Sequence, residues 1–154
     1  MHYEMVINLI CGFIIPWLAA IPIAVRKMKT LLLISPISAV VSLVINSFGF
    51  QMMFWDFTPL IPNDESVSAL PLDIGLYPVL ASYMIWSIQA HRNKTVLILL
   101  LYVIFTTLLE YVGVLIGKVS YGNGWNIGYT CLSYLFAFSI VFVYFKLLER
   151  NRVL

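Results

Sequence analysis

The chain has 154 residues, of which 62% are hydrophobic and only 10% are charged, and its mean hydropathy is +0.96. Soluble globular domains contain about 45–50% apolar and about 25% charged residues, so this composition excludes an ordinary soluble domain. A net charge of only +2, without any long basic run, also excludes a nucleic-acid-binding domain.

Five segments of the chain are apolar enough, and at about 20 residues long enough, to cross the hydrocarbon core of a membrane as helices. They are residues 5–25, 31–54, 71–90, 95–117 and 126–146. We expect the first to stay in the mature protein, because its basic residues follow the apolar stretch, whereas those of a signal peptide precede it. The sequence therefore predicts an all-α membrane protein, a single five-span transmembrane helix bundle over residues 1–154.

The basic residues predict how this bundle is oriented. Lys and Arg collect in cytoplasmic loops close to the ends of spans. Eight of the nine bases fall at span ends on one side, and only Lys118 falls on the other. We therefore expect the N-terminus outside and the C-terminus in the cytoplasm. The acids that this topology places outside are Glu4, Asp56, Asp64, Glu65 and Asp73.

The first outer link, residues 55–69, contains too many prolines for a helix but also carries large apolar side chains. We expect it to lie over the mouth of the bundle at the level of the lipid headgroups, with Trp55 as an aromatic anchor. Pro71 then suits the first turn of the third span. Pro78 is expected to kink that span.

The second outer link contains Gly122-Asn123-Gly124, which is typical of a turn because Gly and Asn tolerate positive φ. Asn123 or Asn126 could then cap the last span by accepting hydrogen bonds from its first N–H groups. A structural turn is sufficient to explain this segment, so the link by itself predicts no functional site.

Glu110 is the charged residue that the predicted topology leaves inside the membrane, in the fourth span. An intramembrane carboxylate is costly and usually faces the interior of a bundle or a wet cavity, so Glu110 is the first candidate for a functional residue. It shares a helix face with Thr106, Gly113 and Gly117, and small residues at this spacing let helices pack closely. The alternative is a protonated, neutral Glu110 that only hydrogen-bonds one helix to another.

The second span carries a stripe of small and polar residues on one face. Its members, at spacings of three and four residues, are Ser35, Ser38, Ser42, Asn46 and Gly49. Such a stripe is more often a helix-packing surface than a substrate path. Asn46 lies at about the depth of Glu110 by helical rise, so its amide could donate hydrogen bonds to that carboxylate.

Acidic and aromatic residues near the outer mouth could complete a pocket around Glu110. Asp73 lies at the start of the third span, where the helix dipole alone would also explain it. If Asp73, Glu110 and Asp56 converge, they form an outward-facing acidic pocket. Its aromatic walls would be Tyr77, Tyr111, Tyr121 and Trp125. A pocket of this kind is suited to a cation or a cationic headgroup.

Other kinds of site find little support. His2 and His91 are expected on opposite sides of the membrane, so they cannot form a metal site together. The sequence contains no phosphate-binding loop or nucleophile motif, and we expect neither a metal nor a cofactor. Cys11 and Cys131 fall at similar depth, which permits a disulfide, although two buried free thiols are the simpler explanation.

Several residues of the outer face occur together in an order that resembles a known family. The marks are Trp55-Asp56-Phe57, Ile61-Pro62 followed by Glu65, Pro71 with Asp73, Pro78 with Tyr83, Glu110-Tyr111, Tyr121 with Trp125, and Tyr129 with Tyr134. Over residues 50–135 the chain resembles an uncharacterised family of small multi-pass membrane proteins found mostly in spore-forming low-GC Gram-positive bacteria. Where that family has a proline after the intramembrane Glu, this chain has Tyr111. The resemblance implies a bacterial plasma membrane and a multi-pass fold, and it implies no activity.

Three functions are compatible with these features. The one we favour is a non-enzymatic membrane protein whose outward-facing polar pocket around Glu110, Asp73 and Asn46 binds or passes a small cation, a proton or an amphiphile. The second is an accessory or scaffolding subunit whose small-residue faces dock on a partner membrane protein or a second copy. The third is a lipid-modifying enzyme that uses the three acids of the pocket as acid and base, although it would lack a nucleophile. The lipid bilayer is a partner in all three, and nucleic acid in none.

Overall fold

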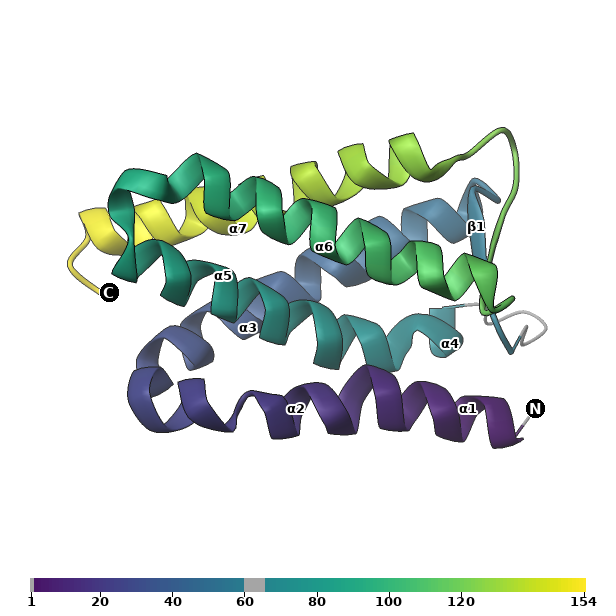
Figure 1. Ribbon diagram of the computed structural model, residues 1–154, viewed down its shortest axis with the longest axis horizontal. Helices are drawn as coiled ribbons and strands as arrows, with labels where there is room; N and C mark the ends of the chain where they lie inside the picture. Colours follow the sequence, from purple (N-terminus) through teal and green to yellow (C-terminus); the bar gives the residue numbers. More distant parts are fainter. Residues whose placement is uncertain (1, 60–65) are drawn as a thin grey trace.

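The computed structural model describes residues 2–59 and 66–154, and its helices run along the long axis of the molecule (Figure 1). The helices are α1 (His2–Leu9), α2 (Ile15–Ala19), α3 (Ile21–Gln51), α4 (Ser66–Pro71), α5 (Tyr77–Ala90), α6 (Thr95–Leu115) and α7 (Ile127–Arg150). Single π-helical turns at Ile10–Ile14 and Leu72–Leu76 join α1 to α2 and α4 to α5, and a 3₁₀ turn at Arg92–Lys94 precedes α6. The described residues also form two short strands, β1 (Trp55–Phe57) and β2 (Val119–Tyr121).

Four helical segments among the described residues are long and apolar enough to cross a membrane. They are Ile21–Gln51, Ser66–Ala90, Arg92–Leu115 and Ile127–Arg150, and a shorter apolar helix covers Tyr3–Ala19. Large apolar side chains are exposed on the outside of the bundle, for example Val44 at 63%, Leu97 at 55% and Phe136 at 61%. A surface of this kind is suited to lipid rather than water. The structure is therefore that of an all-α protein suited to a membrane, the class that the sequence predicts.

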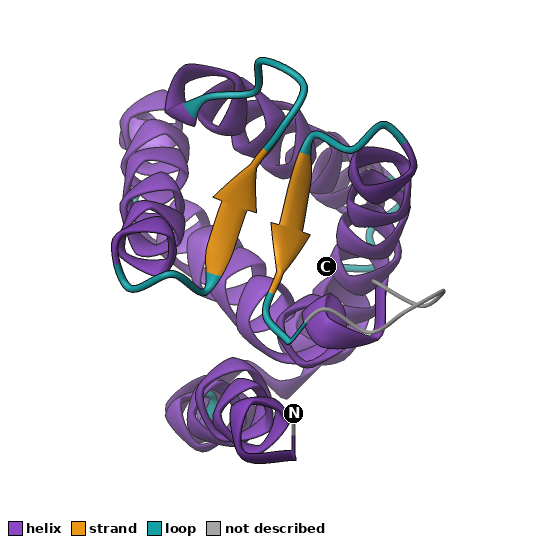
Figure 2. Cartoon of the chain, turned by 90° about the vertical axis from the view of Figure 1, so that its right-hand side faces the viewer, coloured by secondary structure: helices purple, strands orange, loops and turns teal. Residues whose placement is uncertain are grey.

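The ring of the molecule consists of α3, α5, α6 and α7, and Figure 2 shows it end-on. Helix α3 packs against α5 and α7, and α6 packs against the same two helices from the other side. Helix α4 continues into α5 through the π turn Leu72–Leu76. The helix made of α1, the π turn Ile10–Ile14 and α2, here called the N-terminal helix, lies outside the ring against α4 and the second π turn (Figures 1 and 2). The ring thus has one interior, and the N-terminal helix adds a layer on one side of it.

Helix α3 consists of two helices, because Lys27 within it has non-helical φ and ψ of −144° and 44°. The chain reverses direction at this point (Figure 1). Residues 21–26 therefore extend the N-terminal helix, and the rest of α3 belongs to the ring. The link predicted at residues 26–30 is shorter in the structure, since helical geometry resumes directly after Lys27.

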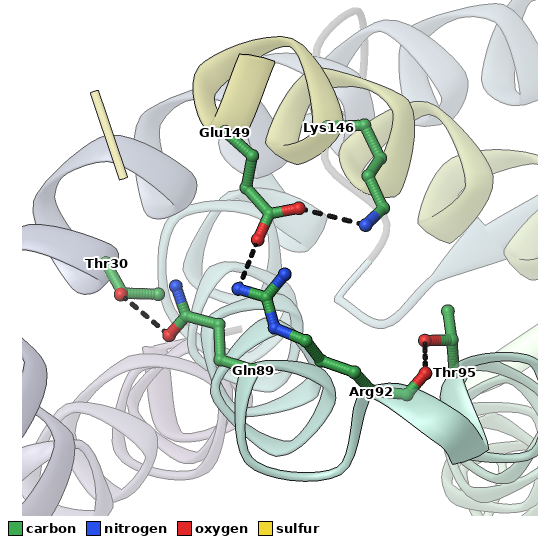
Figure 3. Close-up of polar contacts among 6 residues, drawn as sticks. All are labelled: Thr30, Gln89, Arg92, Thr95, Lys146 and Glu149. Carbon is green, nitrogen blue, oxygen red and sulfur yellow. Dashed lines mark hydrogen bonds and ion pairs between the residues drawn. The ribbon is translucent and has the colours of Figure 1, made fainter. Parts of the chain in front are cut away.

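Basic residues gather at one end of the bundle, here called the basic end. Arg92 and Lys146 lie 2.7 Å and 2.9 Å from the carboxylate oxygens of Glu149, which connects α7 to the turn before α6 (Figure 3). The reversal at Lys27 and the C-terminus of the chain lie at this same end (Figure 1). Lys118 lies at the opposite end, where its amine is 3.9 Å from Glu4. The structure therefore keeps Lys118 at the end opposite the other eight Lys and Arg residues, as the sequence predicts.

At the end opposite the bases, here called the ribbon end, β1 and β2 pair as an antiparallel ribbon that lies over the ring (Figure 2). Trp55 pairs with Tyr121, and Phe57 pairs with Val119. The prediction of Trp55 as a headgroup anchor is wrong, because its side chain is only 6% exposed. Alternate residues of a strand face the same side, so Trp55 and Phe57 both point into the ring. The family marks at Ile61-Pro62 and Glu65 lie outside the described residues.

The third predicted span begins earlier than residue 71. Helix α4 starts at Ser66 and Pro71 is its last residue, so the prediction that Pro71 lies in the first turn is wrong. Pro71 has a helical φ of −60°, and because it has no N–H, one backbone carbonyl of this helix loses its usual partner. Pro78 lies near the start of α5, directly after the π turn, and the distortion expected from Pro78 takes the form of that turn.

Side chains from neighbouring helices satisfy the backbone groups that this distortion leaves open. In a π turn the N–H groups bond one residue further back than in an α-helix, and Pro78 has no N–H. The carbonyls of Asp73 and Ile74 therefore lose their α-helical partners. Ser42 donates its hydroxyl to the carbonyl of Asp73 at 3.2 Å, and Trp17 donates its indole N–H to that of Ile74 at 3.0 Å. Irregular backbone within a membrane requires such partners.

The two π turns pack against each other through glycines. A Cβ atom on Gly75 would fall on the carbonyl oxygen of Gly12 and 2.6 Å from the Cα of Phe13. A Cβ on Gly12 would lie 3.1 Å from the backbone nitrogen of Leu72. Glycine is needed at position 75 because both obstacles are backbone atoms, which cannot move aside like a flexible side chain. This crossing holds the N-terminal helix against α4 and α5.

Gly113 and Gly117 do not form the helix-packing face predicted from their spacing. A Cβ on Gly113 would lie 3.0 Å from Cγ2 of Val119, so this glycine makes room for the ribbon. Gly117 has a positive φ of 73° and lies beyond the end of α6, and a Cβ there would meet no atom of the described residues within 4 Å. The stripe on α3 does face the interior of the ring. Its buried members are Ser35, Ser38, Asn46 and Gly49.

The second link has the turn and the helix cap that the sequence predicts. Asn123 and Gly124 have positive φ values of 48° and 76°. The side chain of Asn126 accepts hydrogen bonds from the N–H groups of Gly128 at 2.9 Å and Tyr129 at 3.3 Å. Asn126 therefore caps α7.

Asn126→Ala is expected to lower the free energy of unfolding by about 1 kcal/mol, because two N–H groups at the start of α7 lose their acceptor. The measurement is unfolding by sodium dodecyl sulfate in mixed micelles, followed by circular dichroism. Asn126→Asp is the control, since it keeps an acceptor oxygen at the cap and should stay close to the native protein. Equal losses in both variants would contradict the capping role.

Candidate functional site

Glu110 lies on α6 at the ribbon end of the ring and accepts hydrogen bonds from three hydroxyl groups. Tyr121 donates to its Oε1 at 2.7 Å, Thr130 lies 3.1 Å from the same oxygen, and Tyr134 donates to Oε2. Thr130 and Tyr134 are four residues apart on α7, so they occupy one face of that helix. Tyr121 reaches the carboxylate from β2. Donors from two elements, β2 and α7, therefore converge on this one acid of α6.

The hydroxyl network continues beyond the carboxylate. The Tyr134 hydroxyl lies 3.0 Å from that of Tyr77 at the start of α5, and the Thr130 hydroxyl lies 3.0 Å from that of Tyr121. Trp125 donates its indole N–H to Thr130 at 2.8 Å. Burial raises the pKa of the Tyr121 phenol above its ordinary value, and the nearby Glu110 raises it further. Tyr121 therefore keeps its proton and remains a hydrogen-bond donor.

A second polar cluster lies beside the first and links α3, the π turn and the ribbon. Asn46 donates to the carboxylate of Asp73 at 2.6 Å, and Trp55 donates its indole N–H to the side-chain oxygen of Asn46 at 3.1 Å. Asp73 is 1% exposed. The expectation that Asn46 donates to Glu110 is therefore wrong. Asn46 and Glu110 are expected at equal depth in the membrane, but residues at equal depth need not be in contact. Helix α3 borders α5 and α7, whereas α6 lies across the ring.

A cavity of about 40 Å³ lies between these two clusters inside the ring. Its polar lining comes from Ser38, Ser42, Asn46, Glu110, Thr130, Ser133, Tyr77 and Tyr134, and its aromatic wall includes Trp55 and Trp125. A cavity needs about 10–15 Å³ to hold one water, so this cavity has room for about three waters or a small cation.

A larger cavity of about 220 Å³ lies between the N-terminal helix and α6. Its lining is mostly apolar and includes Ile7 and Cys11 on one side and Leu109 and Val112 on the other. Glu110 lines this cavity as well as the central one, and so do two hydroxyl partners of the network, Tyr77 and Tyr134. The carboxylate therefore lies in the wall between the two spaces.

Neither acid of the site has a basic partner among the described residues. The ion pairs found there join Arg92 and Lys146 to Glu149, and Lys118 to Glu4. Every donor to Glu110 that the described residues supply is a neutral hydroxyl. The carboxylate oxygens of Glu110 are thus largely satisfied by hydrogen bonds. No positive charge among the described residues balances the negative charge of an ionised Glu110.

The structure brings together most of the residues predicted for the site and leaves two out. Glu110, Asn46, Tyr77, Tyr121 and Trp125 line the central cavity or donate to the carboxylate, and Asp73 joins them through Asn46.

Asp56 lies between Trp55 and Phe57 on β1, so its side chain points away from the ring, and it does not reach the site. Tyr111 is 43% exposed on the outside of α6. The three acids invoked for a lipid-modifying enzyme therefore do not meet.

Sequence reasoning missed Thr130 and Tyr134 as members of the site. Their spacing of four residues on an apolar helix is the signal that could have revealed them. It also missed Trp55 as a donor to Asn46, because an aromatic residue at a span end is usually an interfacial anchor.

In the part of the chain that the structure describes, no group of three metal-binding side chains comes together, and Cys11 and Cys131 are free thiols. No family model, no curated protein and no solved structure matches the chain. The resemblance to small multi-pass proteins of Gram-positive bacteria therefore remains a prediction, and the site has to be interpreted from its own chemistry.

Proposed function

We propose that this is a bacterial plasma-membrane protein of five spans whose cavity beside Glu110 binds a small cation from the outer side. The bases at one end support a cytoplasmic C-terminus and an outer ribbon end. The N-terminal helix supports the fifth span, because residues 21–26 extend it before the chain reverses at Lys27.

The observation that carries the proposal is a carboxylate that lines a cavity and has no basic partner in the described chain. A buried ionised carboxylate is costly unless it is paired. It therefore takes up either a proton or a cation. The rings of Trp55, Trp125 and Tyr77 line the same cavity, and aromatic faces attract cations such as alkylammonium groups.

The packing of the ring's interior supports access for the cation from the ribbon end. Beyond the cavity, toward the basic end, the ring is filled by a cluster of apolar side chains. Its fully buried members include Ile34, Met84, Ile85, Val103 and Phe145. This packing favours a binding site reached from the ribbon end over an open passage to the other side.

Glu110→Gln is expected to weaken binding of tetramethylammonium at least about tenfold, because it removes the attraction between two unit charges, which is about 4 kcal/mol at a separation of about 4 Å near a protein surface. Trp55 and Trp125 line the cavity, so tryptophan fluorescence of the protein in lipid nanodiscs measures the binding. The native protein should also bind more weakly as the pH falls, since protonation removes the charge of Glu110.

Glu149→Gln serves as the matched control, because Glu149 is an acid at the basic end that already pairs with Arg92. It should leave binding unchanged. Undiminished binding by a folded Glu110→Gln variant would refute the proposed function.

A further inference from the structure

The larger cavity reaches Glu110 from the side of the protein that faces lipid. It forms a groove between Ile7 and Cys11 of the N-terminal helix and Leu109 and Val112 of α6. Val112 is 52% exposed, and Ile116, which also lines the groove, is 67% exposed. The groove is therefore an apolar path from the outside of the bundle to the carboxylate.

The charged residues that line the groove determine which kind of molecule it can bind. Among the described residues, the charged ones that line it are Glu110 and Lys118. The amine of Lys118 lies 3.9 Å from the carboxylate of Glu4, so an acid already balances it. Glu110, at the inner end, accepts hydrogen bonds only from neutral hydroxyls in the described structure. The unbalanced charge of the groove is thus negative, which favours a positively charged group.

We propose that the site binds single-tailed amphiphilic cations, with the headgroup at Glu110 and the alkyl tail leaving through the groove into the bilayer. This inference rests on the proposed function, and it names the substrate class. The central cavity of about 40 Å³ has no room for a tail, whereas the neighbouring groove of about 220 Å³ is apolar and touches the same carboxylate. The tail moves from one apolar environment, the lipid, to another, the groove, so this transfer contributes little free energy. The groove therefore selects ligands by whether their tail fits.

The test compares two ligands and two neighbouring substitutions. Leu109→Trp fills the groove, and Leu108→Trp is the matched control because Leu108 is 56% exposed on α6 and lines neither cavity. Binding of octyltrimethylammonium and of tetramethylammonium is measured by calorimetry in lipid nanodiscs, with the heat of empty nanodiscs subtracted. Octyl sulfate, which has the same tail and the opposite charge, controls for non-specific uptake.

Leu109→Trp is expected to weaken octyltrimethylammonium at least about tenfold and to leave tetramethylammonium within about twofold of the native value, while Leu108→Trp changes neither. The inference is overturned if Leu109→Trp leaves octyltrimethylammonium unchanged, or if octyl sulfate binds as tightly as the cation. In either case Glu110-dependent binding of tetramethylammonium would leave the proposed function intact. If tetramethylammonium does not bind the native protein at all, the proposed function fails first.

Discussion

Replacing Gly75 by valine is expected to detach the N-terminal helix from α4 and α5 and to lower the free energy of unfolding by about 3 kcal/mol, the upper part of the usual range for overpacking. The new Cβ would fall on the carbonyl oxygen of Gly12 and 2.6 Å from the Cα of Phe13. Neither atom can yield without moving a helix, so the two π turns must separate. Trp17 would then lose its hydrogen bond to the carbonyl of Ile74.

Unfolding by sodium dodecyl sulfate in mixed micelles, followed by tryptophan fluorescence, measures this loss. Ile74→Val is the control, because it changes the neighbouring residue of the same π turn, whose side chain is 37% exposed. It should cost less than about 1.5 kcal/mol. Gly12→Ala should lie between the two, since its Cβ would meet Leu72 at 3.1 Å. A Gly75→Val variant as stable as Ile74→Val would show that the π turns do not hold the N-terminal helix.

Features of this fold that depend on local chemistry could be predicted from the sequence. The helical segments follow from apolar runs without charges, and the cap at Asn126 follows from an amide placed just before such a run. Positive φ at Asn123 and Gly124 follows from residues that tolerate it. Each of these depends on a few neighbouring residues and needs no information from the rest of the chain.

Features that depend on distant partners could not be predicted in the same way. The π turn before Pro78 is stable because Ser42 and Trp17 supply donors to its open carbonyls, and both come from other helices. The ribbon is formed by two three-residue strands, and their pairing is visible only once the two links lie side by side. Trp55 is buried for the same reason, since the ribbon turns its indole toward Asn46.

The same distinction between local chemistry and distant partners applies to the candidate site. That Glu110 faces the ring follows from the cost of a carboxylate in lipid. Its donors do not follow, because depth along a helix says nothing about which helices are adjacent. Asn46 lies on α3 and meets Asp73, which belongs to the neighbouring segment, whereas Glu110 meets Thr130 and Tyr134 of α7. The predicted acidic pocket thus becomes two polar clusters with different roles.

Asp73 is expected to act through its hydrogen bond to Asn46 and not through its charge. Removing its side chain should therefore have a large effect on stability. Asp73→Ala should lower the free energy of unfolding by about 2–3 kcal/mol, since it leaves the buried amide of Asn46 without an acceptor. Asn46 would then hold the indole of Trp55 less firmly, which loosens β1 over the ring. Unfolding by sodium dodecyl sulfate, with tryptophan fluorescence as the signal, measures the change.

Asp73→Asn separates the two possible roles of this acid. The substitution keeps the size of the side chain and an oxygen that can accept from Asn46, and it removes only the charge. If Asp73 is structural, this variant stays within about 1 kcal/mol of the native protein and binds tetramethylammonium as the native protein does, whereas Glu110→Gln binds it at least about tenfold more weakly. A stable Asp73→Asn variant that has lost binding would place Asp73 in the cation site beside Glu110. The two clusters would then be one acidic site with two carboxylates, because a cation that needs both charges must lie within reach of both.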